Sequence, residues 1–349
     1  MEIYLITAGA LFLFYYGILC FYTGKWNSTF ARFWLVAGIG HFLMIPATKE
    51  EVTLDADIVV VGGGAAGLTA ALSSQQNGNN VILLEKTGVV GGASAMAGGS
   101  LTATNSQWQK EAGYEDSSEM LKERLLEAGH NKNHLPSVEL FTSFIGPNFD
   151  WIVSEEGGNM PYIHEGSGSS YSFEGGGAGA MLKLKENLLN AGAEVLLNTQ
   201  ATELIVNEGA VVGIKAKGDE ANYTINAKAV ILASGGYGHN RDIVPEEYFA
   251  FRYSGHSGHD GDALEMIKAV DGATRNLTWL NKQPNTMILP SGAPQYTNMG
   301  VGAVYKMSGI LVNEKGERFA CENGDTWELM LSMEENERQY LLMDQENYD

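Results

Sequence analysis

Cysteine is nearly absent from this chain, which contains only Cys20 and Cys321 among 349 residues. Two cysteines this far apart cannot form a disulfide framework. The lack of a CxxC pair also excludes the common cysteine zinc sites and covalent attachment of a c-type haem. Proline is scarce as well, with eight residues and no proline-rich linker. The stability of the fold therefore has to come from a packed core.

Basic residues are few: 22 lysines and arginines stand against 42 aspartates and glutamates, for a formal net charge of −20. The acidic residues are scattered along the chain, which is typical of a solvated surface and argues against nucleic acid as a partner. Apolar residues make up 44% of the chain and charged residues 18%. This composition is sufficient to bury a large core over roughly two domains.

The N-terminus carries a long apolar run. Ile3–Tyr22 covers 20 residues without a charge, about the length that crosses the hydrocarbon core of a membrane, and it is apolar all round. A second apolar run, Phe33–Pro46, is shorter and contains His41, so it fits a second span, a re-entrant segment or a signal-like segment. We assign residues 1–47 to a membrane leader of one or two transmembrane helices, with a buried core helix as the alternative.

The basic residues of the leader do not decide its orientation. If both runs cross the membrane, Lys25 and Arg32 favour a cytoplasmic loop and an external large domain. If only the first run crosses, the same charges favour an internal large domain. The predicted location is a cell membrane, and the side of the large domain is left open.

A dinucleotide-binding pattern follows the leader, in the sequence ADIVVVGGGAAGLTAALSS that begins at Ala56. The β-branched run Ile58–Val61 predicts a strand buried on both faces. Gly62 allows a sharp turn, Gly64 lets the backbone approach a pyrophosphate, and Gly67 lets the next helix pack closely on the strand.

The helix after these glycines is expected to start near Ala65. Its first amides, at Ala65 and Ala66, point with the positive end of the helix dipole at the phosphates. A second buried strand, Val81–Leu84, ends in Glu85, 18 residues past Gly67, where a carboxylate can accept hydrogen bonds from the adenosine ribose hydroxyls. This order of elements favours a bound dinucleotide over a glycine-rich turn without a ligand.

A second loop of glycines and small residues, VGGASAMAGGS over 90–100, follows the acidic strand. A plain NAD domain does not need this loop, whereas a longer ligand that runs deep into the protein does. Further motifs are AVILASGGYG at 229–238, HDGDALEMIKAVDGA at 259–273 and GILVNEKGERFACE at 309–322. With these motifs, the chain from about residue 55 onward resembles the FAD-binding domain of the fumarate reductase and succinate dehydrogenase flavoprotein superfamily.

This resemblance implies an α/β fold, the FAD/NAD(P)-binding Rossmann-like fold with an inserted β-meander, and assigns FAD contacts within each motif. The ribose-binding acid falls on Glu85 beside Lys86, and the backbone that meets the adenine falls on Ala201. A GD element that approaches the flavin contains Asp262, which also suits a helix N-cap. The covalent flavin histidine of the respiratory members falls near Ala95, which implies non-covalent FAD. The loop near the flavin consists of Gly92, Ala93, Ser94, Gly98 and Gly99.

The middle of the chain predicts the inserted sheet independently. Met181–Ala191 has the apolar spacing of a helix and ends at Gly192. Val230–Leu232 reads as a buried strand, and Ser234 and Gly235 follow it at the end where open α/β sheets bind ligands. Between the helix and this strand, four short strands are predicted at Val195–Leu197, Ala201–Val206, Val211–Lys217 and Tyr223–Ala227.

The residues in and just before the HDGD element are possible metal ligands. His256, His259, Asp260 and Asp262 are residue types that bind metals, but their spacing matches no standard ligand set. No metal is therefore predicted.

Catalytic residues are not predicted. Members of the family move a hydride between the flavin and a carbon next to a carbonyl or carboxylate, which requires fixed positive charge. The family histidine falls on Gln283, one arginine falls near Tyr305 and Lys306, and the proton-donating arginine falls near Thr326. These departures argue against fumarate itself as the substrate. Gln283, Tyr305 and Lys306 are either a different substrate set or ordinary surface residues.

Three regions are predicted: the leader over 1–47, an FAD-binding domain over 52–281, and part of an α+β cap domain over 282–349. Within the cap region, Arg318 is expected to form a structural salt bridge with Glu322. Family members continue past the last residue, so a fragment, a chain completed by another chain and a decayed copy are all open.

The expected function is hydride transfer between FAD and a small unsaturated acid or ketone. An electron-donor protein or a completing chain is the expected protein partner. The alternatives are a non-catalytic flavoprotein that needs a partner chain and an NAD-binding module.

Overall fold

The computed structural model describes residues 49–154, 157, 160, 162–164, 170–282, 286–292, 294–296, 309–322, 326–336 and 338–343. The chain divides into two units, 1–50 and 51–349, and nearly all described residues belong to the second unit.

One part of the predicted fold class, the transmembrane segment, is corrected. Within the ranges just given, no helix is both long enough and apolar enough to cross a membrane. Even α7 (Leu135–Val153), which has 19 residues, carries Glu139 and Asp150, and charges at membrane depth are costly. The leader assigned to residues 1–47 lies outside the described residues, and the predicted membrane location is not tested.

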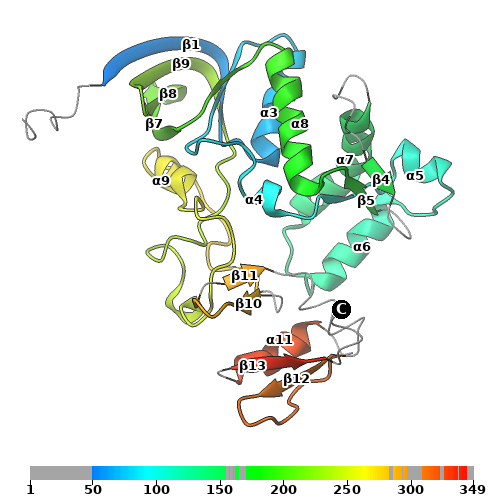
Figure 1. Ribbon diagram of the computed structural model, residues 1–349. Helices are drawn as coiled ribbons and strands as arrows, with labels where there is room; N and C mark the ends of the chain where they lie inside the picture. The colour runs from blue at the N-terminus through cyan, green and yellow to red at the C-terminus, as the bar shows by residue number, and fades with distance from the viewer. Residues whose placement is uncertain are drawn as a thin grey trace, which may run out of the picture. The chain divides into compact units, whose positions relative to one another are not determined.

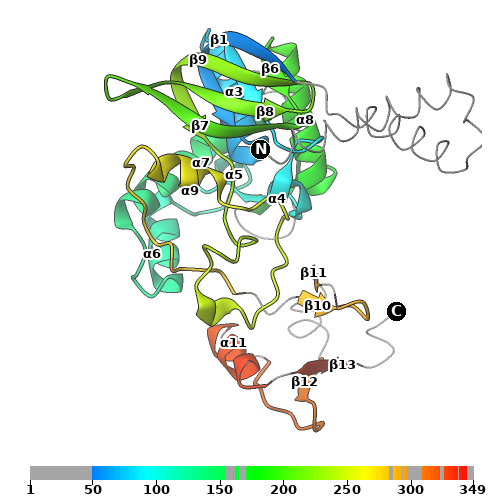
Figure 2. The same ribbon diagram turned by 90° about the vertical axis from the view of Figure 1, so that its left-hand side faces the viewer.

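The largest sheet of the described residues has six strands, in the order β6-β2-β1-β9-β8-β7. Figure 1 shows β1 with β9, β8 and β7, and Figure 2 also shows β6. β2 pairs in parallel with both β1 and β6, whereas β7, β8 and β9 form an antiparallel meander. Both the α/β fold and the inserted meander were predicted, and the sheet confirms them. The strands are β1 (Glu50–Val61), β2 (Val81–Leu84), β6 (Glu194–Leu196), β7 (Thr199–Asn207), β8 (Ala210–Gly218) and β9 (Ala221–Leu232).

The last strand of the meander differs from the prediction. Tyr223–Ala227 and Val230–Leu232 were expected as separate strands but form one continuous strand, β9. Its first half pairs with β8, and the whole strand lies between β8 and β1 in the sheet. Only Lys228 and Ala229 separate the two predicted segments. Because neither is a turn-forming residue, the chain passes straight from the meander into the main sheet.

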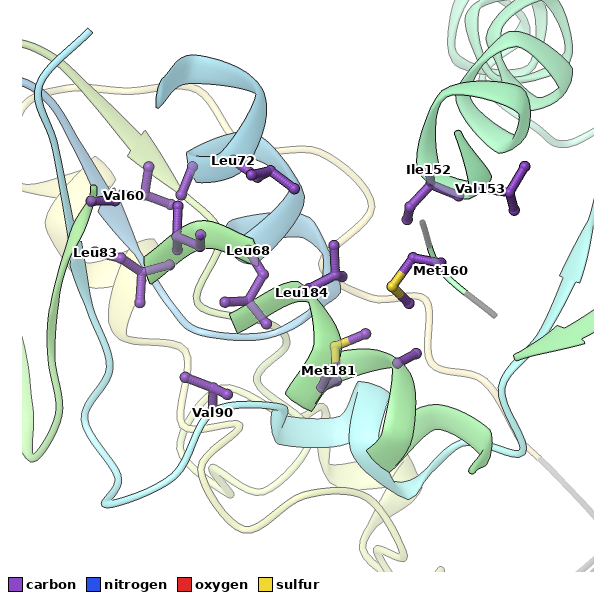
Figure 3. Close-up of a cluster of buried hydrophobic side chains, with 14 of the residues drawn as sticks. Val60, Leu68, Leu72, Leu83, Val90, Ile152, Val153, Met160, Met181 and Leu184 are labelled. Atoms are coloured by element: carbon purple, nitrogen blue, oxygen red, sulfur yellow. The ribbon is translucent and has the colours of Figure 1, made fainter. Parts of the chain in front are cut away.

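Alternate residues of β1 and β2 pack into two separate hydrophobic cores, because successive side chains of a strand point to opposite faces of the sheet. Val60 and Leu83 belong to one cluster, together with Leu68 from α3 (Ala65–Gln76) and Leu184 from α8 (Gly176–Asn190) (Figure 3). The two helices lie side by side against the sheet (Figures 1 and 2). The neighbouring strand residues, such as Val59 and Ile82, belong to the second cluster.

Smaller elements complete the described part of the chain. A three-stranded sheet has the order β3-β5-β4. Its strands are β3 (Ser100–Thr102), β4 (Tyr162–His164) and β5 (Ser170–Phe173), and the remaining helices are α4 (Gly92–Met96), α5 (Gln107–Glu111), α6 (Ser118–Ala128), the 3₁₀ turn η1 (Glu246–Tyr248) and α9 (Asp262–Lys268).

The region predicted as a cap has mixed α and β structure. A hairpin pairs β10 (Thr286–Ile288) with β11 (Pro294–Tyr296). β12 (Ile310–Asn313) pairs with β13 (Gln339–Leu342) next to α11 (Thr326–Glu334). Buried Leu311 and Leu329 form a small core of their own. The predicted domain boundaries stay predictions.

The predicted salt bridge in this region is confirmed. Arg318 donates to Glu322, whose side chain is only 3% exposed. Glu322 Oε1 also accepts a hydrogen bond of 2.7 Å from the amide of Leu311 on β12. Burial acts to raise the pKa of Glu322, but the hydrogen bonds from Arg318 and the Leu311 amide outweigh burial, so the pKa is lowered.

We expect Glu322→Ala to destabilise the protein by about 1–3 kcal/mol, because the Leu311 amide then has no acceptor. A group with a lowered pKa stabilises the fold above its ordinary pKa of 4.5 and stops doing so as the pH falls through the lowered value. The difference between wild type and variant should therefore shrink in acid, which denaturant unfolding at several pH values will measure. Glu314→Ala, at an exposed position in the turn that follows β12, is the control. A constant difference at every pH would contradict the role of the carboxylate.

Candidate functional site

The first glycine loop has the close contacts that its sequence predicts. Gly62 has φ +106°, and a Cβ at this position would lie 2.4 Å from the carbonyl oxygen of Ala233. A Cβ on Gly67 would lie 1.8 Å from the carbonyl oxygen of Gly62. Both positions therefore exclude any larger residue, and the loop is held tightly between β1, α3 and the end of β9.

Helix α3 begins at Ala65, as predicted, and presents backbone donors at its first turn. Its N-cap Gly64 offers no side chain to accept from them. Within the described residues, the amides of Gly64, Ala66 and Gly67 have no acceptor. Unpaired amides at a helix start bind anions, since the helix dipole adds to their positive charge.

The second loop contacts the first through backbone and side chain. The amide of Gly91 donates to Gly63 O at 2.8 Å, and Ser94 Oγ accepts from the Ala65 amide at 3.1 Å. Ser94 thus takes one of the amides that the sequence had assigned to phosphate, a contact that the sequence alone did not predict.

The other predicted residues of this loop lie around α4. Gly92 and Ala93 form its first turn, and Gly98 and Gly99 follow its end. The loop is anchored to α8 by the amide of Gly177, which donates to Ala97 O at 3.1 Å.

Glu85 is buried at the end of β2 and accepts two backbone hydrogen bonds from the protein. Its Oε2 accepts from the Gly63 amide at 2.8 Å, and its Oε1 accepts from the Thr87 amide at 2.8 Å. Oε1 also lies 2.7 Å from the Thr87 hydroxyl, whose single proton it shares with Val89 O at the same distance. A carboxylate has about four acceptor positions, so about one remains on Oε2 for a ribose hydroxyl. The predicted acid therefore also fixes the glycine loop, a role that the sequence did not indicate.

The third loop follows β9 and lies against the first. The amide of Ala233 donates to Val61 O at 2.8 Å. A Cβ on Gly62 would lie 2.9 Å from the Cα of Ser234. The hydroxyl of Ser234 is buried and has no hydrogen-bond partner in the described part of the chain. An unsatisfied buried hydroxyl costs free energy, which a ligand with polar groups at this point would relieve.

Lys86 connects the end of β2 to the start of α9. Its Nζ lies 2.9 Å from Asp260 Oδ2 and 2.8 Å from Asp262 Oδ2. Burial acts to lower the pKa of Lys86, but the hydrogen bonds to Asp262 and Asp260 outweigh burial and raise it. The ammonium group therefore stays charged at neutral pH and holds the two carboxylates together.

Asp262 is not the N-cap that the sequence predicted. The N-cap of α9 is Gly261, and Asp262 is the first residue of the helix. Its carboxylate contacts Lys86 and accepts from Gln200 Nε2 at 3.2 Å, so it is turned away from the helix amides. Among the described residues, no group of three or more His, Cys, Asp and Glu side chains is arranged to hold a metal ion.

Ala201 is buried in β7 next to an irregularity in the strand pairing. It pairs with Ala216, but the next pair is Glu203 with Lys215, so Thr202 is an extra residue on its strand. Such a bulge leaves backbone groups outside the ladder. The predicted backbone contact with adenine is compatible with this geometry and stays a prediction.

The substrate positions are less well defined by the structure. Gln283, Tyr305 and Lys306 lie outside the described residues, whereas Thr326 is the first residue of α11. The described site is therefore the cofactor site.

Three adjoining loops at the ends of β1, β2 and β9, with unpaired amides and a buried acid, define a protein of the dinucleotide-binding class. Residues 57–345 match the family described as "FAD binding domain". The chain belongs to this family, and its cofactor is FAD.

Relatives of known function share part of their length with this chain. Urocanate reductase of Eggerthella lenta is 32% identical over 295 residues, which cover 80% of this chain and 48% of the relative. Fumarate reductase (cytochrome) of Shewanella frigidimarina is 29% identical over 253 residues, which cover 68% and 43%. The chain thus spans about half the length of these two relatives.

Solved structures agree on the fold. The open conformation of a flavocytochrome c3 fumarate reductase superposes with a TM-score of 0.72 at 24% identity, covering 84% of this chain and 54% of the other. A 3-ketosteroid-Δ4-(5α)-dehydrogenase of Rhodococcus jostii RHA1 superposes with a TM-score of 0.63 at 20% identity, covering 88% and 69%. At these identities the likeness concerns the fold alone.

Proposed function

We propose that this chain is the FAD-binding part of an oxidoreductase that transfers a hydride between flavin and a small unsaturated acid or ketone. The observation that carries the proposal is the junction of the three loops, where amides at the start of α3, the Ser234 hydroxyl and one acceptor position of Glu85 have no partner among the described residues. The names of the relatives, urocanate reductase and fumarate reductase, support an unsaturated acid as the substrate class.

Different parts of FAD are proposed to contact different parts of the site. The diphosphate is held by the amides of Gly64, Ala66 and Gly67, since these donors have no other acceptor within the described residues. The adenosine ribose donates to the remaining position on Glu85, and the backbone around Ala201 meets the adenine. The flavin half lies toward the second loop, which comprises Gly92, Ala93, Ser94, Gly98 and Gly99.

FAD, when bound, supplies the hydride chemistry. The chain's own residues bind and orient it. The departure at Gln283 from the family histidine favours a substrate other than fumarate. A ketone or an acid recognised without that histidine is the proposed substrate class.

A spectroscopic and a kinetic measurement test this function on the full chain. The purified protein should be yellow, with the absorbance of oxidised flavin, and should release FAD on denaturation. A reduced viologen dye should then be oxidised when fumarate, urocanate, acrylate or a cyclic enone is added, with a smaller response to fumarate than to the best acceptor. A colourless protein that binds NAD instead would contradict the proposal.

One outcome would favour the second candidate, a non-catalytic flavoprotein that needs a partner chain. That candidate is supported by Gln283 and Thr326, which stand where the family has a histidine and a proton-donating arginine. Bound FAD without oxidation of the dye by any acceptor would select it.

A further inference from the structure

Two polar atoms beside Gly235 have no partner among the described residues. One is the buried hydroxyl of Ser234. The other is Nε2 of His259, and a Cβ on Gly235 would lie 2.8 Å from this nitrogen. The imidazole edge therefore lies directly against the third glycine loop. That loop adjoins Gly62 through Ser234, so the hydroxyl lies at the junction where the diphosphate is proposed to bind, and the imidazole lies against the next residue of the same loop.

The other nitrogen of the His259 ring is fixed by Tyr253. The Tyr253 hydroxyl donates to His256 O at 3.1 Å and lies 2.9 Å from His259 Nδ1. A phenol has a single proton to donate, and a carbonyl oxygen can only accept, so we assign this proton to His256 O and the Tyr253 oxygen as the acceptor from Nδ1–H. The neutral ring therefore has a lone pair at Nε2, and only the protonated ring can donate a hydrogen bond there.

The surroundings of the His259 ring lower its pKa, which favours the neutral imidazole in the absence of a ligand. Burial, His256 and Lys86 lower the pKa of His259, and Asp260 opposes them with a smaller effect. The rings of His256 and His259 are 5.8 Å apart. Tyr253 is itself neutral, since burial and Asp260 raise its pKa. An anion at the loop would reverse this balance.

We propose that protonated His259 donates from Nε2 to the diphosphate of FAD, beside a hydrogen bond from the Ser234 hydroxyl, so that FAD binding takes up one proton from solvent. The inference rests on the proposed function, since it needs FAD in the junction. From the sequence alone, His259 is a candidate only for metal binding. Its position against Gly235 assigns it to the cofactor instead.

The sign of the pH dependence follows from this proton. Binding raises the pKa of His259, so FAD affinity is greatest below the pKa of the free protein and falls as the pH rises through the pKa of the complex. Between these two values, the uptake of one proton changes the Kd by about tenfold per pH unit.

Titration of the deflavinated full chain with FAD, followed by flavin fluorescence at about pH 5.5 to 8.5, tests the proposal. Wild type should bind more tightly at the acid end. His259→Asn should weaken binding by about tenfold at the acid end and abolish the pH dependence. Ser234→Ala should weaken binding at every pH and keep the slope. His239→Asn, which removes the imidazole hydrogen-bonded to Asp260, should keep the slope as well.

Two further measurements do not depend on preparing an apoprotein. FAD release from the diluted holoprotein should be faster at high pH in wild type and independent of pH in His259→Asn. Calorimetry in buffers of different ionisation enthalpy should detect the uptake of a proton. A slope that survives in His259→Asn, or that is lost in His239→Asn, overturns the assignment. If wild type binds FAD with no pH dependence, this inference fails and FAD binding stands, whereas a wild type that binds no FAD fails the proposed function itself.

Discussion

Gly67→Ala should unfold at a markedly lower denaturant concentration than wild type and should retain almost no FAD. The added methyl group would lie 1.8 Å from the carbonyl oxygen of Gly62, a distance that no side-chain rotation can relieve, because both partners are backbone. Helix α3 must then move away from β1, which disturbs the packing of its fully buried residue Leu68. Overpacking of this kind costs about 3 kcal/mol, which is a large share of the stability of a domain, roughly 5–15 kcal/mol.

Two further glycine variants separate packing from cofactor binding. A Cβ on Gly64 would lie 3.6 Å from Ser94 Oγ, an ordinary contact, so Gly64→Ala should fold normally but lose FAD where the diphosphate approaches the backbone. Gly78 has φ +82° and no neighbour within 4 Å. Gly78→Ala should therefore show backbone strain of about 1 kcal/mol and normal FAD binding. If Gly67→Ala is as stable as Gly78→Ala, the close approach is not what holds α3.

The sequence predicted those parts of the fold that follow from local periodicity and glycine chemistry. β2 has its predicted bounds of Val81–Leu84 and α3 starts at Ala65, as expected, because a short apolar run and a glycine turn each allow only one local structure. The division of β9 into two strands was wrong because pairing partners, not local pattern, decide where a strand ends. β1 begins at Glu50, well before its apolar segment, for the same reason.

The site prediction depends on motifs whose spacing reflects a ligand. The glycines and Glu85 were assigned to FAD on that ground, and these contacts stay predictions. The contacts of Ser94 with Ala65 and of His259 with Gly235 join segments far apart in the sequence, and nothing in the spacing of these residues indicates that they meet. Asp262 was placed correctly at the start of α9 but given the wrong partner, since the sequence did not show that Lys86 and Gln200 compete for its carboxylate.

Glu85→Ala should lower both the free energy of unfolding and the affinity for FAD, which makes it the sharpest test of the proposed site. The Gly63 amide is buried and donates only to Glu85 in the described structure, so its loss of an acceptor costs about 1–3 kcal/mol. The glycine loop is then free to shift, and the ribose loses its acceptor. We expect a loss of FAD affinity of roughly 100-fold, because at least one charge-assisted hydrogen bond and the loop position are both lost. Equilibrium unfolding and FAD titration measure the two effects separately.

Thr87→Val is the matched control, because it removes the hydroxyl whose proton Glu85 Oε1 shares with Val89 O and leaves the Gly63 bond to Oε2 intact. It should change FAD affinity little, since the ribose is proposed to use Oε2. Glu85→Gln keeps one acceptor oxygen but turns an amide N–H₂ toward either Gly63 or Thr87, so it should fall between Glu85→Ala and wild type in both measurements. If Thr87→Val loses FAD while Glu85→Gln keeps it, the ribose does not bind at Oε2 and the proposed orientation of the adenosine is wrong.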